Sequence, residues 1–237
     1  MALSHPPLRL ILAVAFGGIA LLAALATSLL AGTEAARRVE ANQLGQLETA
    51  AARFAERLDR DMAARWRDVQ VAASLPGMRD PATPPEVRRG ILRQLQETFA
   101  DYALLAFVAP DGRVVADSLQ LLEGQDASGR PFVRAGMQGP VAEDVHDALL
   151  LAGKLGDDGQ LRLLDLAAPV QAADGRLVGV IAAHLNWRWA ADLVGTPRPG
   201  EPEILILSHL GEVLLGPPAL LGQRLAGPTA PPPDGRG

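Results

Sequence analysis

The sequence predicts an α+β protein in which long N-terminal helices precede a small antiparallel sheet. Three observations predict this class. Residues 10–31 are an uncharged run of 22 residues, residues 33–75 repeat apolar side chains every three or four positions, and short apolar runs separated by turn sequences follow Tyr102. Strands joined by such short turns run antiparallel, so we expect one antiparallel sheet with the helices gathered on one side.

The uncharged run at residues 10–31 is long enough to cross a membrane as a helix, since each residue adds about 1.5 Å and the hydrocarbon layer is about 30 Å thick. Residues 1–9 carry Arg9 and no acidic residue, whereas glutamates follow the run, which places residues 1–9 in the cytoplasm. A cleaved signal peptide is the alternative, although its apolar core usually has only about 7 to 15 residues. Both interpretations export the residues after Gly32.

Residues 33–75 are predicted to form one long amphipathic helix, because they contain no proline and only one glycine, Gly45. Its apolar residues recur at Leu47, Ala51, Phe54, Leu58, Met62, Trp66, Val69 and Ala73. We expect this stripe to pack against a core or against a second copy of the chain, which would make the protein a homodimer.

Turn sequences divide the rest of the chain into short elements. Pro76-Gly77 ends the long helix, and Thr83-Pro84-Pro85-Glu86 matches a capping box that starts a second helix. The core face of that second helix would be Val87, Ile91, Leu95 and Phe99. Five strands are predicted at residues 103–109, 113–118, 145–152, 161–170 and 176–186, with short helices at 130–137 and 187–194. A last hairpin within residues 203–216 would open a second, partial module at residues 201–225, and residues 226–237 form a proline-rich tail.

The composition limits the classes of protein to which the chain can belong. Its 237 residues are enough for one domain and a fragment of another, and 49% of them are hydrophobic, so the chain can bury a core. A net charge of −5 would repel a phosphate backbone, which argues against nucleic acid as a partner. Without cysteine the chain has no disulfide, no thiolate metal site and no cysteine nucleophile. Its four histidines lack the spacing of a helical zinc pair, and we expect neither a metal nor a cofactor.

Two motifs carry a resemblance to a known family. Residues 124–135, GQDASGRPFVRA, are similar to the G-x-D-x-S-x-R-P-[YF]-[FV] stretch of the double Cache family, and residues 168–180 are similar to its strand-turn-strand ending in Gly-Val. The chain therefore resembles the extracytoplasmic sensors of bacterial transmembrane receptors. The resemblance covers about residues 34–195, and residues 203–222 resemble only the first hairpin of a second module.

This resemblance implies a PAS-like five-stranded sheet with a pocket helix between its second and third strands, and residues 76–195 would be the membrane-distal sensor module. It implies a small ligand between sheet and pocket helix, and a sensor in the periplasm anchored in the bacterial inner membrane. Signals would reach a cytoplasmic output such as a diguanylate cyclase, a histidine kinase or a chemotaxis transducer. The sequence contains no signature of these outputs, so we expect a truncated gene product or the front part of a longer receptor.

The first candidate site residues lie at the start of the pocket helix. The guanidinium of Arg130 can form two parallel hydrogen bonds with a ligand carboxylate, a role that the resemblance also implies. The alternative is an ion pair between Arg130 and Asp126 that holds the loop. Phe132 lies where amino-acid-binding members of the family have an aromatic residue, and Val133 lies where they often have a second one. The missing ring puts an amino-acid ligand in doubt, and both residues could instead be plain core.

His184 should share one strand face with Val178, Val180 and Ala182, because side chains alternate along a strand. The resemblance places it where amino-acid-binding members have an aspartate that takes the ammonium group of the ligand. A histidine there favours an anionic or neutral ligand held by His184 and Arg130, and the alternative is a core histidine.

Asp165 lies inside an apolar strand and should face the same way as Leu163 and Ala167. A carboxylate there needs a partner, which could be Arg134 or a ligand, unless the position is an edge open to water.

Two further groups of residues are interpreted as structural. The first could in principle hold a divalent cation but lacks the spacing of a calcium loop, so we expect a solvated loop at Glu143, Asp144, His146 and Asp147. Trp187 and Trp189 are interpreted as packing residues.

The sequence favours a binding module over an enzyme, because it contains no G-x-S-x-G, no H-E-x-x-H and no convincing pair of carboxylates, and we predict no catalytic residue. The candidate ligand is a small organic acid. Its candidate binding residues are Arg130, Phe132, Val133, Arg134, Asp165 and His184. The alternative is a structural or dimerisation scaffold that binds no ligand, which predicts a filled apolar core with Arg130 facing water.

Overall fold

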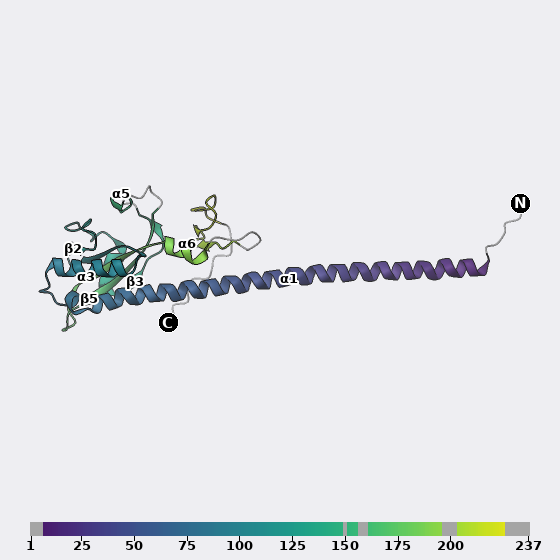
Figure 1. The fold of residues 1–237 in the computed structure, drawn as a ribbon, viewed down its shortest axis with the longest axis horizontal. Helices are drawn as coiled ribbons and strands as arrows, with labels where there is room; N and C mark the ends of the chain where they lie inside the picture. Colours follow the sequence, from purple (N-terminus) through teal and green to yellow (C-terminus); the bar gives the residue numbers. More distant parts are fainter. Residues whose placement is uncertain (1–6, 149–150, 156–160, 196–202, 226–237) are drawn as a thin grey trace. The chain divides into compact units, whose positions relative to one another are not determined.

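The computed structural model describes residues 7–148, 151–155, 161–195 and 203–225 (Figure 1). The chain divides into two compact units, residues 1–53 and 54–237. Helix α1 (Leu8–Ser74) supplies the described part of the first unit, and its last turns belong to the second. The predicted tail at residues 226–237 lies outside the described residues.

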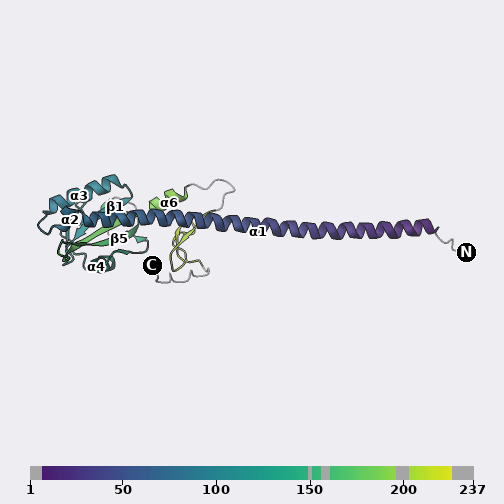
Figure 2. The same cartoon turned by 90° about the horizontal axis from the view of Figure 1, so that it is seen from below.

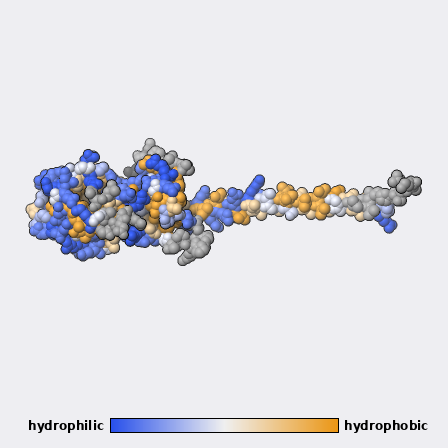
Figure 3. Space-filling view, turned by 90° about the horizontal axis from the view of Figure 1, so that it is seen from above, coloured by the Kyte–Doolittle hydropathy of each residue, from blue (hydrophilic) through white to orange (hydrophobic). Residues whose placement is uncertain are grey.

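In the first unit, the described large apolar side chains of α1 are exposed, and Figure 3 shows orange patches along part of this stretch, with blue and white residues between them. Within the described residues one helix is long and apolar enough to cross a membrane, and it is this one. The helices predicted at residues 10–31 and 33–75 are one continuous helix. No proline interrupts it at Gly32, and the Thr33 hydroxyl donates to the carbonyl of Leu30 (3.0 Å) within the helix.

The second unit is built on an antiparallel sheet with the strand order β2-β1-β6-β5-β3, and β4 pairs with β5 beside β3. The strands are β1 (Tyr102–Val108), β2 (Val114–Asp117), β3 (Val141–Ala142), β4 (His146–Asp147), β5 (Arg162–Gln171) and β6 (Leu177–Asn186). The two longest strands, β5 and β6, form a hairpin whose turn contains Gly175 at φ +83°, a conformation that favours glycine.

The predicted third strand at residues 145–152 is confirmed only at His146–Asp147, while residues 149–150 lie outside the described residues. In the described part of the chain the sheet has six strands instead of five. Two short strands, β3 and β4, replace it, and residues 152–155 form the helix α5 (Ala152–Leu155). Between the short strands the Asp144 carboxylate accepts a hydrogen bond from the Val145 N–H (2.9 Å), so this polar segment leaves the ladder.

Helices cover both faces of the sheet and not one, because each face buries its own apolar cluster. The end of α1, α2 (Pro76–Arg79) and α3 (Pro85–Thr98) pack on the cluster that contains Met78, Leu92, Phe107, Leu166, Ile181 and Leu185. Helix α4 (Pro131–Gln138) packs on the opposite cluster, which contains Leu104, Val108, Phe132, Val133, Leu163 and Val180. Figure 2 shows α3 and α4 on opposite sides of the strands.

The amphipathic stripe of α1 is confirmed where the helix meets the sheet. Leu58, Met62 and Trp66 pack against the first cluster, and Val69 and Ala73 belong to it. Leu47, nearer the N-terminus, is exposed. Contacts within one chain therefore explain why the C-terminal part of the stripe is apolar, but not why Leu47 is.

The predicted start of the second helix is off by one residue. Its N-cap is Pro84 in an extended conformation, no side chain caps it, and the helix begins at Pro85. A residue that precedes proline is forced towards extended backbone, which moves the cap from Thr83 to Pro84. Of the predicted core face, Ile91 and Leu95 pack on the first cluster, whereas Val87 and Phe99 are exposed.

The end of the sheet carries a short helix and a separate hairpin. Helix α6 (Arg188–Val194) begins between two tryptophans, Trp187 and Trp189, whose rings lie edge to face with centroids 5.8 Å apart. Both are buried in the first cluster, which confirms their packing role. The predicted last hairpin is present as β7 (Ile206–Leu207) and β8 (Val213–Leu215).

Candidate functional site

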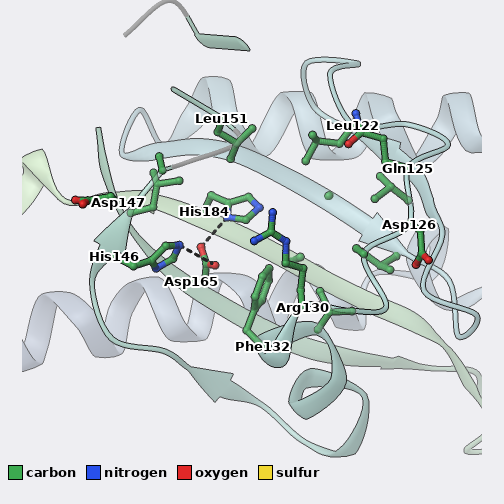
Figure 4. A pocket seen from close by; sticks show the side chains of 18 residues that line it. Leu122, Gln125, Asp126, Arg130, Phe132, His146, Asp147, Leu151, Asp165 and His184 are labelled. Carbon is green, nitrogen blue, oxygen red and sulfur yellow. Dashed lines mark hydrogen bonds and ion pairs between the residues drawn. The ribbon is translucent and has the colours of Figure 1, made fainter. Parts of the chain in front are cut away.

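A cavity of about 130 Å³ lies between α4 and the sheet, on the face of the second apolar cluster (Figure 4). Side chains from β1, β2, α4, β4, β5 and β6 line it. Its apolar wall includes Ala106, Val108, Val114, Phe132, Val133 and Leu163. Concave, largely apolar sites with a few polar groups are the usual form of a ligand site.

The loop that leads into α4 is held by a buried carboxylate. Asp117, at the end of β2, is fully buried and accepts hydrogen bonds from the backbone N–H groups of Leu119 (2.9 Å), Leu121 (3.0 Å) and Leu122 (2.8 Å). These bonds turn the chain so that Leu122 reaches the cavity wall.

Glu123 fixes the same loop from outside. Its carboxylate accepts two hydrogen bonds from the Arg89 guanidinium, at 2.6 and 2.9 Å. The hydrogen bond from Arg89 lowers the pKa of the Glu123 carboxyl, and the backbone N–H of Asp117 adds to this effect. The loop is therefore tied to α3 by a charged pair.

Arg130 is the N-cap residue of α4; it lines the cavity and remains exposed to solvent. Figure 4 shows its guanidinium turned towards the ring of His184, with Asp126 on the other side of the loop. Within the described part of the chain no ion pair joins Arg130 to Asp126, whose Oδ1 instead accepts the Ser128 N–H (2.8 Å). Hydrogen bonding to the Ser128 side chain, and after it to the Ser128 backbone N–H, lowers the pKa of Asp126.

Phe132 and Val133 are buried and line the cavity while they also belong to the second cluster. The Phe132 ring lies edge to face with the His184 ring, with centroids 5.5 Å apart. Both residues therefore belong to the core and to the cavity wall, and their contact with a ligand stays a prediction.

Arg134 is exposed on α4 and does not line the cavity. The buried side of α4 is formed by Phe132, Val133 and Gly136, so Arg134 falls on the opposite side of the helix. Asp165 therefore does not have Arg134 as its partner.

The partner of Asp165 is His184. These residues lie directly opposite each other on β5 and β6, and Asp165 Oδ1 lies 2.6 Å from His184 Nδ1. Asp165 is only 3% exposed, on a strand paired on both sides, so the alternative of an edge open to water is wrong. Val180 and Ala182 share the face of His184 as predicted. Val178 packs on the other cluster, because a register shift between the strands falls at its position.

His146 is a cavity residue that sequence reasoning missed. Its Nε2 lies 3.5 Å from Asp165 Oδ2, and 44% of its side chain is exposed. The predicted solvated loop around it is only partly correct, since Asp147 also lines the cavity and accepts a hydrogen bond from Arg162 (3.2 Å). No pattern along the sequence marks His146, because β4 has only two residues and its pairing with β5 is what places it at the cavity.

In the part of the chain that the structure describes, no group of three or more histidine, aspartate and glutamate side chains could hold a metal ion. Asp144, from the predicted loop, instead lies 2.9 Å from Nδ1 of His209.

Comparison with known proteins supplies relatives in structure but not in sequence. No protein-family model matches the sequence, and no curated protein matches it. An extracellular ligand-binding receptor from Desulfohalobium retbaense matches 73% of this chain at 18% identity with a TM-score of 0.61. This chain covers only 32% of that receptor.

Two further structures match at similar levels. The ligand-binding domain of the Pseudomonas aeruginosa amino-acid chemoreceptor PctC, in complex with GABA, has 20% identity and a TM-score of 0.61, and the match covers 78% of each chain. The sensor domain of the V. cholerae histidine kinase DctB has 17% identity and a TM-score of 0.58, with 75% of this chain and 68% of that chain covered. The fold is that of the Cache-type sensor domains.

The resemblance carried by residues 124–135 and 168–180 is thereby confirmed at the level of fold. In this Cache fold the first motif forms the loop and N-terminal half of α4, and the second forms the β5–β6 hairpin. The first motif lines the cavity, whereas the second supplies no lining residue and lies on the same hairpin as Asp165 and His184, which do.

Proposed function

We propose that the chain is the extracytoplasmic sensing part of a bacterial transmembrane receptor, and that its ligand is a small organic acid bound in the cavity under α4. The observation that carries the proposal is the guanidinium of Arg130, which enters an otherwise largely apolar cavity. A guanidinium is matched in shape and charge to a carboxylate, with which it forms two parallel hydrogen bonds.

The surroundings of Arg130 support this ligand class. A volume of about 130 Å³ suits a molecule of a few non-hydrogen atoms, and Val133 and Leu163 provide apolar contacts for a short carbon chain. His184 contributes a second polar group beside the guanidinium, and Phe132 packs against its ring. A scaffold without a ligand predicts a filled core on this face, and the cavity argues against it; the exposure of Arg130 agrees with that alternative.

The rest of the receptor is also a proposal. Helix α1 would anchor the chain in the inner membrane and leave the sheet in the periplasm, as its exposed apolar run supports. The exposed apolar residues Val39, Leu44 and Leu47 would pair with those of a second copy. Ligand binding would shift the equilibrium of such a dimer only by the difference in affinity between its states.

Thermal unfolding of the 237-residue chain in detergent micelles tests the ligand class. We expect propionate to raise the unfolding temperature and propylamine, which has a similar size and the opposite charge, to leave it unchanged. The variant Arg130→Gln should lose the response to propionate. Arg134→Gln, which removes an exposed arginine on the same helix, should keep it. Stabilisation by propylamine alone would overturn the charge argument.

A further inference from the structure

We propose that an acid binds in this cavity together with one proton, which Nε2 of His184 takes from solvent, and that Asp165 positions the histidine for this uptake. The inference rests on the proposed function and adds a regulation to it: the affinity for an acid should depend on pH.

The charges around the cavity show why a proton is needed. Among the described residues that line it, Arg130 is the only arginine or lysine. The carboxylates are Asp126 in the loop before α4, Asp147 on β4 and Asp165 on β5. Asp126 is exposed and Asp147 has Arg162 as its partner, so Asp165 is the buried negative charge that an incoming anion meets. One arginine cannot balance both Asp165 and a ligand carboxylate.

The hydrogen bond between Asp165 and His184 decides which nitrogen can take the proton. An ionised carboxylate only accepts, so Nδ1–H of His184 donates to Asp165 Oδ1. An uncharged His184 then has a bare Nε2, which cannot donate to a ligand carboxylate. A proton added at Nε2 creates a donor and a positive charge, and Asp165 on the other side of the ring stabilises that imidazolium.

His146 on β4 is the other titratable group that faces Asp165. It is farther away, at 3.5 Å, and its side chain is 44% exposed, so solvent screens its charge. His184 has a side chain only 12% exposed and lies beside Arg130, where an acid would bind. His209, which is exposed, pairs with Asp144 and does not line the cavity, serves as the control for His184.

An amino acid provides the comparison on the ligand side. L-Alanine differs from propionate mainly by its ammonium group, which brings its own positive charge next to Asp165. If both ligands bind, propionate should need a proton from solvent and L-alanine should not.

Calorimetric titration of the 237-residue chain in detergent micelles, at about pH 7.5 in phosphate and in Tris, measures proton uptake directly. We expect the enthalpy of propionate binding to differ between the two buffers, in proportion to their ionisation enthalpies, by the amount that corresponds to uptake of a proton. The enthalpy of L-alanine binding should be the same in both buffers. His184→Gln should abolish the buffer dependence for propionate, and His209→Gln should keep it. Asp165→Asn should remove it and strengthen propionate binding at about pH 8, because it removes the buried negative charge.

The wild-type chain alone provides a second measurement if a variant does not fold. Above the titration range of histidine the propionate affinity should fall about tenfold per pH unit, as linkage to one proton requires. If the propionate affinity does not depend on pH and the binding enthalpy does not depend on the buffer, the proposed proton uptake is wrong, while the proposed sensor function still stands. If propionate does not bind at all, the proposed function fails and the coupling fails with it.

Discussion

Asp165 and His184 face each other across the central strand pair, with Asp165 Oδ1 2.6 Å from His184 Nδ1. The carboxylate is almost fully buried, and the histidine connects it to the side of the cavity into which Arg130 extends. A polar pair in the middle of an apolar sheet face is costly to leave unsatisfied, so each residue explains why the other is there.

Asp117→Ala should destabilise the second unit strongly, because three backbone N–H groups of the cavity loop lose their acceptor. We expect a loss of about 2 to 4 kcal/mol in the free energy of unfolding. Urea unfolding followed by tryptophan fluorescence measures it, since all three tryptophans lie in this unit. Asp174→Ala is the control, because that exposed turn residue accepts the N–H of Arg176 and contacts its guanidinium at the surface, so that its loss should change little. Equal effects of the two variants would contradict the role given to Asp117.

Gly136→Ala should push α4 away from the sheet. A Cβ at this position would lie 2.6 Å from the Cβ of Ala167 and 3.0 Å from a methyl of Val180, closer than packed atoms approach. Overpacking of this kind costs about 1 to 3 kcal/mol, and the cavity should be distorted with it. Thermal unfolding with and without propionate measures both effects. Gly139→Ala, at the end of the same helix with open space around it, should be neutral, and a neutral Gly136→Ala would show that α4 is loosely packed.

The Arg89–Glu123 pair should make the stability of the fold depend on pH. Its hydrogen bonds hold the pKa of the Glu123 carboxyl below the ordinary 4.5, so the folded state binds this proton less readily than the unfolded state. The stabilisation is therefore fully present above about pH 4.5 and is lost as the pH falls through the lower folded value. Unfolding midpoints of the wild type and Glu123→Gln between pH 3 and 7 should converge at the acidic end. Curves that remain parallel would exclude this contribution.

Arg162→Met should release the β7–β8 hairpin from the sheet. The guanidinium lies 2.9 Å from Glu212 and 3.3 Å from the carbonyl of Leu214 on one side, and 3.2 Å from Asp147 on the other. Hydrogen exchange should accelerate at residues 206–215 and around Asp147, while the β5–β6 hairpin remains protected. Arg176→Met removes an exposed arginine whose contact is with Asp174 in a turn, and it should leave these rates unchanged. Unaltered exchange in Arg162→Met would mean that other contacts hold the hairpin.

The long strands could be predicted almost to the residue, whereas the short ones could not. Residues 161–170 and 176–186 were predicted, and β5 and β6 are Arg162–Gln171 and Leu177–Asn186, because each is apolar and an Asp-Gly turn separates them. The strand predicted at residues 145–152 is confirmed only at His146–Asp147, because two-residue strands have no period of their own. Their pairing is decided by contacts with β5, which are distant in sequence.

The candidate site could likewise be predicted only in part, because some of its residues belong to a local motif and others are brought together by strand pairing. Arg130, Phe132 and Val133 follow from a local motif at the start of a helix, and they do line the cavity. Arg134 could have been placed outside it, since the apolar positions of α4 define the opposite side. The contact of Asp165 with His184 depends on the register of two strands, and His146 depends on the pairing of β4, so neither follows from a pattern along the chain.

The hydrogen bond between Asp165 and His184 should also be detectable in the sequences of related proteins. If either position drifts to an apolar residue, the other is left without its partner, so the two should change together over evolution. Lineages that keep the pair and lineages that lose both are the ones whose receptors should differ in what they detect.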